Sequence, residues 1–220
     1  MRYQIINKLS AVKLGLFYIE NVNVNKQNMS LWSKINQLCN SLREKYNLET
    51  INDIETVKSV REMFKSEGMD PSRYRPSSEA LLRRILRGQE LYKINSVVDV
   101  NNWCSLEFFL PMGVYDAGNI VGKTITFRLG TNDESYTGID GEIQNAQGKI
   151  IMTDEEKICG GPVSDSDKTM IAANTKKVLM VIYAPQDCQK AILQSTLEIS
   201  IKRMITYNGG DLGFQVVIGY

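Results

Sequence analysis

Hydrophobic positions in the first half of the chain recur at helical spacing after one opening strand. The segment 14–24 is rich in β-branched and aromatic residues, which predicts that strand. Apolar residues then return every three or four positions, as they do along the buried face of an amphipathic helix. This pattern predicts four helices, at 31–42, 54–64, 77–87 and 96–109.

Polar residues at the starts of these segments are of the kinds that cap helices. Ser30 precedes the first helix, and either Ser77 or Ser78 can cap the third. Ser96–Asp99 has the spacing of a capping box and opens the fourth. Asp187 is placed to cap a fifth, long helix that extends to residue 204.

In the second half of the chain, short strand-like runs separated by glycines replace the helical pattern. The predicted strands are 125–128, 142–144, 149–153, 178–183 and a terminal one at 214–218. The run Val178–Tyr183 is apolar throughout and too short for a helix, which indicates a central strand buried on both faces. Helices first and a glycine-rich sheet second predict an α+β fold, with residues 1–220 forming a single domain.

The residue counts exclude several kinds of chemistry. A chain of 220 residues that is 43% hydrophobic and 23% charged is globular rather than disordered, collagenous or a membrane bundle. The absence of histidine excludes Ser-His-Asp and Cys-His catalysis and most catalytic zinc sites. The four cysteines form no C-x-x-C pair, so we expect reduced, mostly buried thiols and no metal or cofactor.

The N-terminal residues lack the unbroken apolar core of a signal peptide, and no run approaches the length of a membrane span. We therefore expect a cytoplasmic protein without a membrane partner. The net charge of +1 gives no overall field that would attract DNA, RNA or lipid, so any polyanion must bind to a local patch.

Such a patch is present around the third predicted helix. Residues 70–93 contain six basic and three acidic side chains. Arg83, Arg84 and Arg87 lie opposite the apolar face of the helix, and Arg75 precedes it. These arginines are candidates for contacts with RNA phosphates, although a solvated helix face explains them equally well.

Residues 94–116 hold polar side chains in an otherwise apolar helix. Asn101, Asn102 and Ser105 need hydrogen-bond partners where water is scarce, and either a bound ligand or neighbouring backbone can supply them. The frame of Val97–Asn102 and Leu110–Asp116 resembles the motif Val-Val-Asp-Val-Thr-Asn followed by Gln-Pro-Met-His-Ala-Phe-Asp. That motif is typical of the tRNA-binding and editing module, the third and fourth structural domains, of the bacterial phenylalanyl-tRNA synthetase beta subunit.

The resemblance covers residues 75–185. It continues in the family's order through Ile139–Gly141, Thr153–Glu155, Gly160–Gly161 and Thr175–Tyr183. The resemblance implies a free-standing homologue of that module, with helices packed against a mixed, largely antiparallel sheet. It also implies a quality-control site that accepts the 3′ end of tRNA carrying a wrongly attached tyrosine and hydrolyses the ester. This hydrolysis depends on an ordered water, backbone groups and the terminal ribose hydroxyl, without a metal.

Carried over to this chain, the resemblance implies a substrate pocket. Asn102 matches the family's asparagine, Asn101 stands where threonine is usual, and Gly160 and Gly161 match a loop that lines the pocket. Two positions depart from the family. Gly113 replaces its histidine, and Val181 replaces the glutamate that reads the tyrosine hydroxyl, so selectivity for tyrosine is not expected.

Two functional hypotheses follow. The first is a deacylase that hydrolyses mischarged aminoacyl-tRNA in trans, and the second is a non-catalytic module that binds an amino acid or a partner. The chain is too short for a complete ligase. No catalytic residue is assigned. Candidates for positioning water are Asn101, Asn102 and the polar residues of 165–169, whereas 164–167 is expected to be an exposed loop and Cys159 an inert buried thiol.

Overall fold

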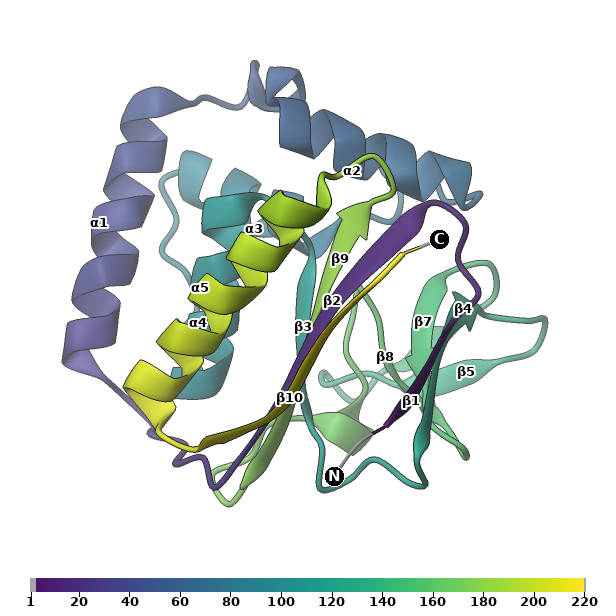
Figure 1. Cartoon of the computed structure of the whole chain (residues 1–220). Coiled ribbons are helices and arrows are strands. Elements are labelled where there is room, and N and C mark those ends of the chain that lie inside the picture. The colour runs from purple at the N-terminus through teal and green to yellow at the C-terminus, as the bar shows by residue number, and fades with distance from the viewer. Residues whose placement is uncertain (1–2, 220) are drawn as a thin grey trace.

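The computed structural model describes residues 3–219 (Figure 1). Its helices are α1 (Met29–Lys45), α2 (Glu55–Ser66), α3 (Ser77–Leu86), α4 (Ser96–Phe108) and α5 (Lys190–Asn208), with short 3-10 turns η1 (Ile51–Asp53) and η2 (Asp167–Thr169). Its strands are β1 (Gln4–Asn7), β2 (Val12–Glu20), β3 (Met112–Asp116), β4 (Thr124–Leu129), β5 (Ser135–Thr137), β6 (Ile143–Asn145), β7 (Ile150–Thr153), β8 (Ile158–Gly160), β9 (Lys177–Pro185) and β10 (Asp211–Ile218). The predicted α+β class is confirmed.

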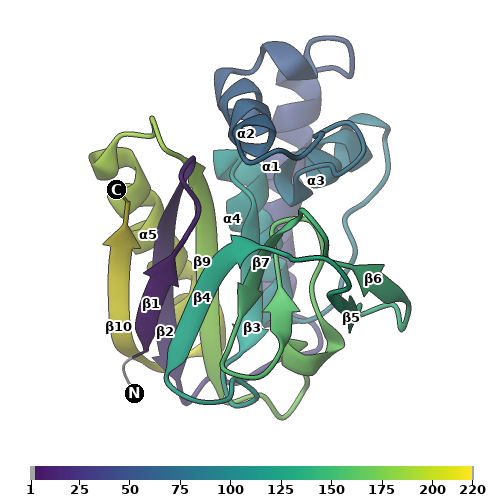
Figure 2. The ribbon, with the colours of Figure 1, turned by 90° about the vertical axis from the view of Figure 1, so that its right-hand side faces the viewer.

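The strands form two four-stranded sheets and a small hairpin rather than one sheet. The first, here called the β9 sheet, has the order β10-β2-β9-β3 and is antiparallel throughout. The second, the β7 sheet, has the order β1-β4-β7-β8, and only its β1·β4 pair is parallel. Strands β5 and β6 pair separately. Figure 2 shows the β7 sheet on one side of the β9 sheet and helices α4 and α5 on the other.

Strand β9 is the centre of this arrangement. It pairs with β2 on one side and β3 on the other, so that Val181 lies between Leu16 and Gly113. Ile182 faces α5, because Gly15 beside it approaches Leu193 and Leu197. Tyr183 faces the other way, with its ring centroid 5.9 Å from that of Phe127 in the β7 sheet. The predicted central strand buried on both faces is confirmed.

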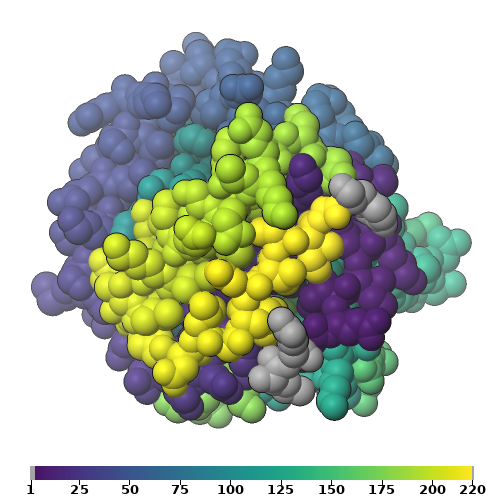
Figure 3. Space-filling model, in the orientation of Figure 1, coloured from purple at the N-terminus to yellow at the C-terminus, as the bar shows by residue number. Residues whose placement is uncertain are grey.

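Helix α5 lies along the β9 sheet, and Figure 3 shows it beside β10 on this surface. Buried side chains from all five helices join those of both sheets in one continuous apolar core. None of the described helices is both long and apolar enough to cross a bilayer.

Several predicted caps are wrong, because the expected residues lie inside the helix or too far before its first residue. Asn28, not Ser30, caps α1, and Asn95 caps α4 by accepting a hydrogen bond from the Val98 amide. The hydroxyl of Ser96 instead contacts Asn208, so the capping box does not form. Helix α3 follows Pro76 and α5 follows Gln189, and neither residue makes a side-chain cap.

Four strands were not predicted: β1, β3, β5 and β8. Each has five residues or fewer, so period-two alternation has too few positions to be recognised. Strand β3 also contains Gly113 and directly follows Pro111, which are residues that usually argue against a strand.

A buried polar contact joins α1 to α4. The indole N–H of Trp32 donates to Asp99 Oδ2 at 2.8 Å, and the amide of Ile94 donates to Asp99 Oδ1 at 3.1 Å. Asp99 is 1% exposed, so both donors depend on this carboxylate rather than on water.

Replacing Asp99 with alanine is expected to lower the free energy of unfolding by about 2–4 kcal/mol, because two donors lose their acceptor and each unpaired buried group costs about 1–3 kcal/mol. Urea unfolding measures this loss. In a Trp32→Phe background the same replacement should cost less, since one donor is already gone. Equal losses in the two backgrounds would contradict this role of the Trp32–Asp99 contact.

Candidate functional site

Several residues of the predicted pocket meet around the ring of Tyr115. Gly113 of β3 pairs with Val181 of β9, and Tyr115 follows two residues along the same strand. A Cβ atom on Gly113 would lie 2.6 Å from Tyr115 Cζ and closer still to its hydroxyl. A Cβ atom on Gly160 would lie 2.9 Å from Tyr115 Cε1. The two glycines therefore leave room for the phenol, which occupies the space beside them.

The hydroxyl of Tyr115 contacts a second buried phenol. Its hydroxyl lies 3.2 Å from the hydroxyl of Tyr183, and both rings are fully buried. Burial raises the pKa of Tyr115 well above its usual range, and burial likewise raises the pKa of Tyr183. Both phenols are therefore neutral hydrogen-bonding groups at physiological pH.

A carboxyl group lies next to these phenols. Asp165 Oδ1 is 3.1 Å from the position of a Cβ on Gly160, and this buried oxygen has no hydrogen-bond partner among residues 3–219. Desolvation raises the pKa of Asp165 to about 7. A carboxyl with this pKa can exchange a proton near neutral pH, which makes it a candidate acid or base.

The expectation of an exposed loop at 164–167 is wrong for Asp165 and Ser166. Asp165 forms a β-bridge with Gly160, and the amide of Ser166 donates to the Cys159 carbonyl, so this segment folds back on β8. Asp167 is exposed, as expected. Burial raises the pKa of the Cys159 thiol to about 12, so the thiol is inert.

Asn101 and Asn102 lie at the free edge of β3. Asn101 Nδ2 is 3.4 Å from both the Met112 carbonyl oxygen and Asn102 Oδ1. Asn101 is 6% exposed, and its Oδ1 has no partner within the described chain. Ser105, by contrast, donates to the Leu110 carbonyl at 2.8 Å. A backbone carbonyl therefore accepts the hydrogen bond of Ser105. Asn101, which contacts the residue before Gly113, keeps its Oδ1 as an acceptor without a partner in the described chain.

Gly161 is a packing position. A Cβ atom there would overlap the carbonyl oxygen of Ile150 in β7, and Gly160 before it has φ of +142°, a region that favours glycine. The carbonyl of Pro162 accepts a hydrogen bond from the Ser77 amide at 3.0 Å. This bond places the start of α3 directly beside the Gly160–Gly161 turn.

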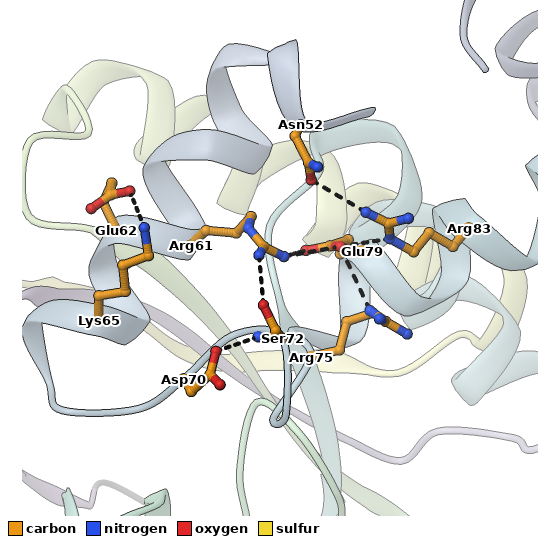
Figure 4. Close-up of polar contacts among 9 residues, drawn as sticks. All are labelled: Asn52, Arg61, Glu62, Lys65, Asp70, Ser72, Arg75, Glu79 and Arg83. Carbon is orange, nitrogen blue, oxygen red and sulfur yellow. Dashed lines mark hydrogen bonds and ion pairs between the residues drawn. The ribbon is translucent and has the colours of Figure 1, made fainter. Parts of the chain in front are cut away.

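The arginines near α3 differ in how far they are engaged (Figure 4). Buried Glu79 accepts from Arg83 Nε at 2.7 Å and from Arg61 at 2.9 Å, and Arg75 Nε lies 3.6 Å away. Arg61 lies on α2 and was not predicted as part of this cluster. Because three guanidinium groups surround one carboxylate, the cluster keeps an excess of two positive charges.

Arg84 and Arg87 lie outside this cluster. The Arg84 guanidinium lies 3.7 Å from the centre of the Tyr92 ring and donates to the carbonyl of Glu90. Arg87 is exposed and forms no ion pair or side-chain hydrogen bond with residues 3–219. It is therefore the most available of the four predicted arginines.

A hollow of about 910 Å³ opens next to the hairpin β5–β6, and none of the predicted pocket residues lines it. Asp154 and Lys168 form an ion pair in its wall, and Arg128 and Glu134 form another at 2.7 Å. Within residues 3–219, no group of three or more His, Cys, Asp or Glu side chains is arranged to hold a metal ion.

Comparison with known proteins matches residues 59–208 to the B3/4 domain. The phenylalanine–tRNA ligase beta subunit of Fusobacterium nucleatum subsp. nucleatum is 25% identical over 154 residues, which cover 62% of this chain and 19% of that protein. The same subunit of Geobacter sulfurreducens is 37% identical over 67 residues, 30% of this chain and 8% of that protein. The relationship to the beta subunit is thus confirmed, and this chain spans about a fifth or less of these relatives.

Among solved structures, an N-terminal fragment of the phenylalanyl-tRNA synthetase beta subunit from Pyrococcus horikoshii aligns with this chain. The alignment covers 100% of this chain and 56% of that chain, with a TM-score of 0.46 and 10% sequence identity.

Gly113→Ala is expected to destabilise the protein by about 1–3 kcal/mol, because the added methyl group overlaps the buried Tyr115 phenol. In a Tyr115→Leu background, which lacks the phenol, the same substitution should cost clearly less. Thermal and urea unfolding of the four proteins measure the coupling. Additive effects would contradict the close fit between Gly113 and Tyr115.

Asp165→Asn is expected to change how stability depends on pH. Between pH 4 and 7 the folded chain retains a proton on Asp165 that the unfolded chain releases, so the contribution of Asp165 to stability falls as pH rises through this window and levels off above pH 7. A pKa difference between 3.8 and about 7 allows up to roughly 4 kcal/mol. The asparagine variant should lose this slope, whereas Asp167→Asn should keep it. The same slope in wild type and in Asp165→Asn would contradict the buried, protonatable carboxyl.

Proposed function

This chain belongs to the B3/4 domain family, and on this premise we propose that it binds the 3′ end of aminoacylated tRNA and hydrolyses mischarged esters in trans. The observation that supports the proposal most is that two predicted pocket positions, Gly113 and Gly160, meet at the ring of Tyr115 and that the Asp165 carboxyl lies against Gly160. Val181 lies opposite Gly113 on the neighbouring strand. Asn101, with its free Oδ1, adjoins the same strand.

In the proposed reaction, the Asp165 carboxylate accepts a proton from a water molecule whose oxygen attacks the ester carbonyl carbon. The tetrahedral intermediate then breaks the bond between this carbon and the ribose oxygen, and Asp165 returns the proton to the departing oxygen. The products are the free amino acid and tRNA. A pKa of about 7 suits both transfers, because such a group gains and loses a proton readily at neutral pH.

The proposed pocket comprises Asn101, Asn102, Gly113, Gly160, Gly161 and Val181. Within it, Asn101 Oδ1 can accept a hydrogen bond from the amino group or the ribose hydroxyl of the substrate. Arg75, Arg83, Arg84 and Arg87 are proposed to contact phosphates of the tRNA. The bond from Ser77 to Pro162 supports this assignment, since it brings the start of α3 next to the pocket.

One observation favours a second candidate, a non-catalytic module that binds an amino acid or a partner. The ring of Tyr115 occupies the space beside Gly113 and Gly160, and fully buried Val181 has no polar atom to recognise a phenol. A large aromatic substrate side chain therefore cannot enter without displacing Tyr115. Any amino acid accepted by the described conformation must have a small side chain.

The test incubates the purified 220-residue chain with a panel of correctly charged and mischarged aminoacyl-tRNAs and follows loss of the ester. We expect hydrolysis of a restricted set with small amino acids, at a rate that rises with pH up to about 7 as Asp165 ionises. Asp165→Asn should lower the rate about a hundredfold or more, because it removes the base. Asn102→Ala should also reduce it.

The matched control is Asp167→Asn, which changes an exposed carboxylate of the same segment and should leave the rate unchanged. If the wild-type chain hydrolyses no ester of the panel but an aminoacyl-tRNA or a free amino acid raises its melting temperature, the binding module is correct and the deacylase is wrong.

A further inference from the structure

We propose that Arg73 and Lys149, held over the ring of Tyr74, form a phosphate-binding site for the single-stranded end of an RNA. Arg73 Cζ lies 5.1 Å and Lys149 Nζ 4.9 Å from the centre of this one ring. That the ligand is an RNA end rests on the proposed function. The site itself does not require the protein to hydrolyse an ester.

The two cations lack acidic partners. Neither Arg73 nor Lys149 forms an ion pair within residues 3–219, in contrast to Arg83 and Arg128, which are paired to Glu79 and Glu134. Burial, and then the charge of Arg73, lower the pKa of Lys149. Two uncompensated positive charges that disfavour one another are stabilised when an anion binds between or beside them.

The position of this pair relative to the pocket supports an RNA end as the ligand. Lys149 precedes Ile150, whose carbonyl packs against Gly161, and the amide of Ile150 donates to Met69 Sδ at 3.3 Å. The segment that carries Arg73 and Tyr74 therefore lies against the start of β7. It continues to Ser77, which bonds the carbonyl of Pro162. The pair is thus adjacent to the Gly160–Gly161 turn.

A second group of cations follows the pair along the chain. Arg75 follows Tyr74, and its buried Nε has no hydrogen-bond partner within the described chain. Beyond it, Arg61 and Arg83 share Glu79 (Figure 4). Different phosphates of one strand can therefore meet the Tyr74 pair and the Glu79 cluster. Such a track fits a chain of regularly spaced charges better than an isolated anion.

The experiment titrates the protein into a short single-stranded RNA labelled with fluorescein at its 5′ end and records anisotropy over a range of salt concentrations. In the variant Arg73→Gln/Lys149→Gln we expect an affinity about tenfold lower at low salt. The slope of log K against log salt should be smaller by about 1.4, because each lost phosphate contact on a single strand contributes about 0.7. Tyr74→Leu, which frees both cations from the ring, should give a weaker effect of the same kind.

The matched control is Lys45→Gln. Lys45 Nζ lies 5.1 Å from the centre of the Tyr46 ring, a pair of the same kind at the end of α1, and its removal should change neither the affinity nor the slope. Unfolding curves establish that each variant folds. An unchanged affinity and slope in the double variant, or wild-type binding to anionic lipid vesicles but not to RNA, would overturn the proposal.

The outcome separates this site from the deacylase. If RNA binding responds as expected but no aminoacyl ester is hydrolysed, the phosphate site stands and the deacylase fails. If ester hydrolysis persists in the double variant with unchanged KM and unchanged RNA affinity, the deacylase stands and the phosphate site fails.

Discussion

The pairing of β9 with both of its neighbours is the constraint on which the rest of the structure depends. Because β9 hydrogen-bonds to β2 and β3 along most of its length, its register fixes which side chains meet on each side of the sheet. Ile182 faces α5, while the next residue, Tyr183, faces the β7 sheet. A slip of one residue would exchange these faces and bring the phenol of Tyr183 among the helices.

The same register explains the shape of the candidate site. Gly113 lies opposite Val181, and two residues later Tyr115 approaches Tyr183 from the neighbouring strand. Only glycine at 113 admits the phenol of Tyr115 over the strand. Val181, opposite Gly113, is fully buried as well.

Periodicity predicted the long elements because each has enough positions to define a buried face. Helices α1 to α5 and strand β9 were predicted in this way. The grouping of Asn101, Gly113 and Gly160 in one pocket came instead from the resemblance to the beta subunit. Asp165 was among the candidates for positioning water, but local pattern could not reveal the burial of its carboxyl, since this results from a bridge to Gly160 in a different segment. The same holds for Asn95 and Asn28, whose capping depends on where the backbone turns.

Charge shows the same difference between local pattern and tertiary environment. The run of arginines at 83, 84 and 87 draws attention in the sequence, yet buried Glu79 binds Arg83, and Arg84 packs on Tyr92. Lys149 stands alone in the sequence, more than sixty residues away, but shares a ring with Arg73 and has no acidic partner in the described chain. An anion gains most from cations that no carboxylate already neutralises. The proposed phosphate site is therefore defined by charges that folding leaves unpaired, and not by where basic residues are most frequent.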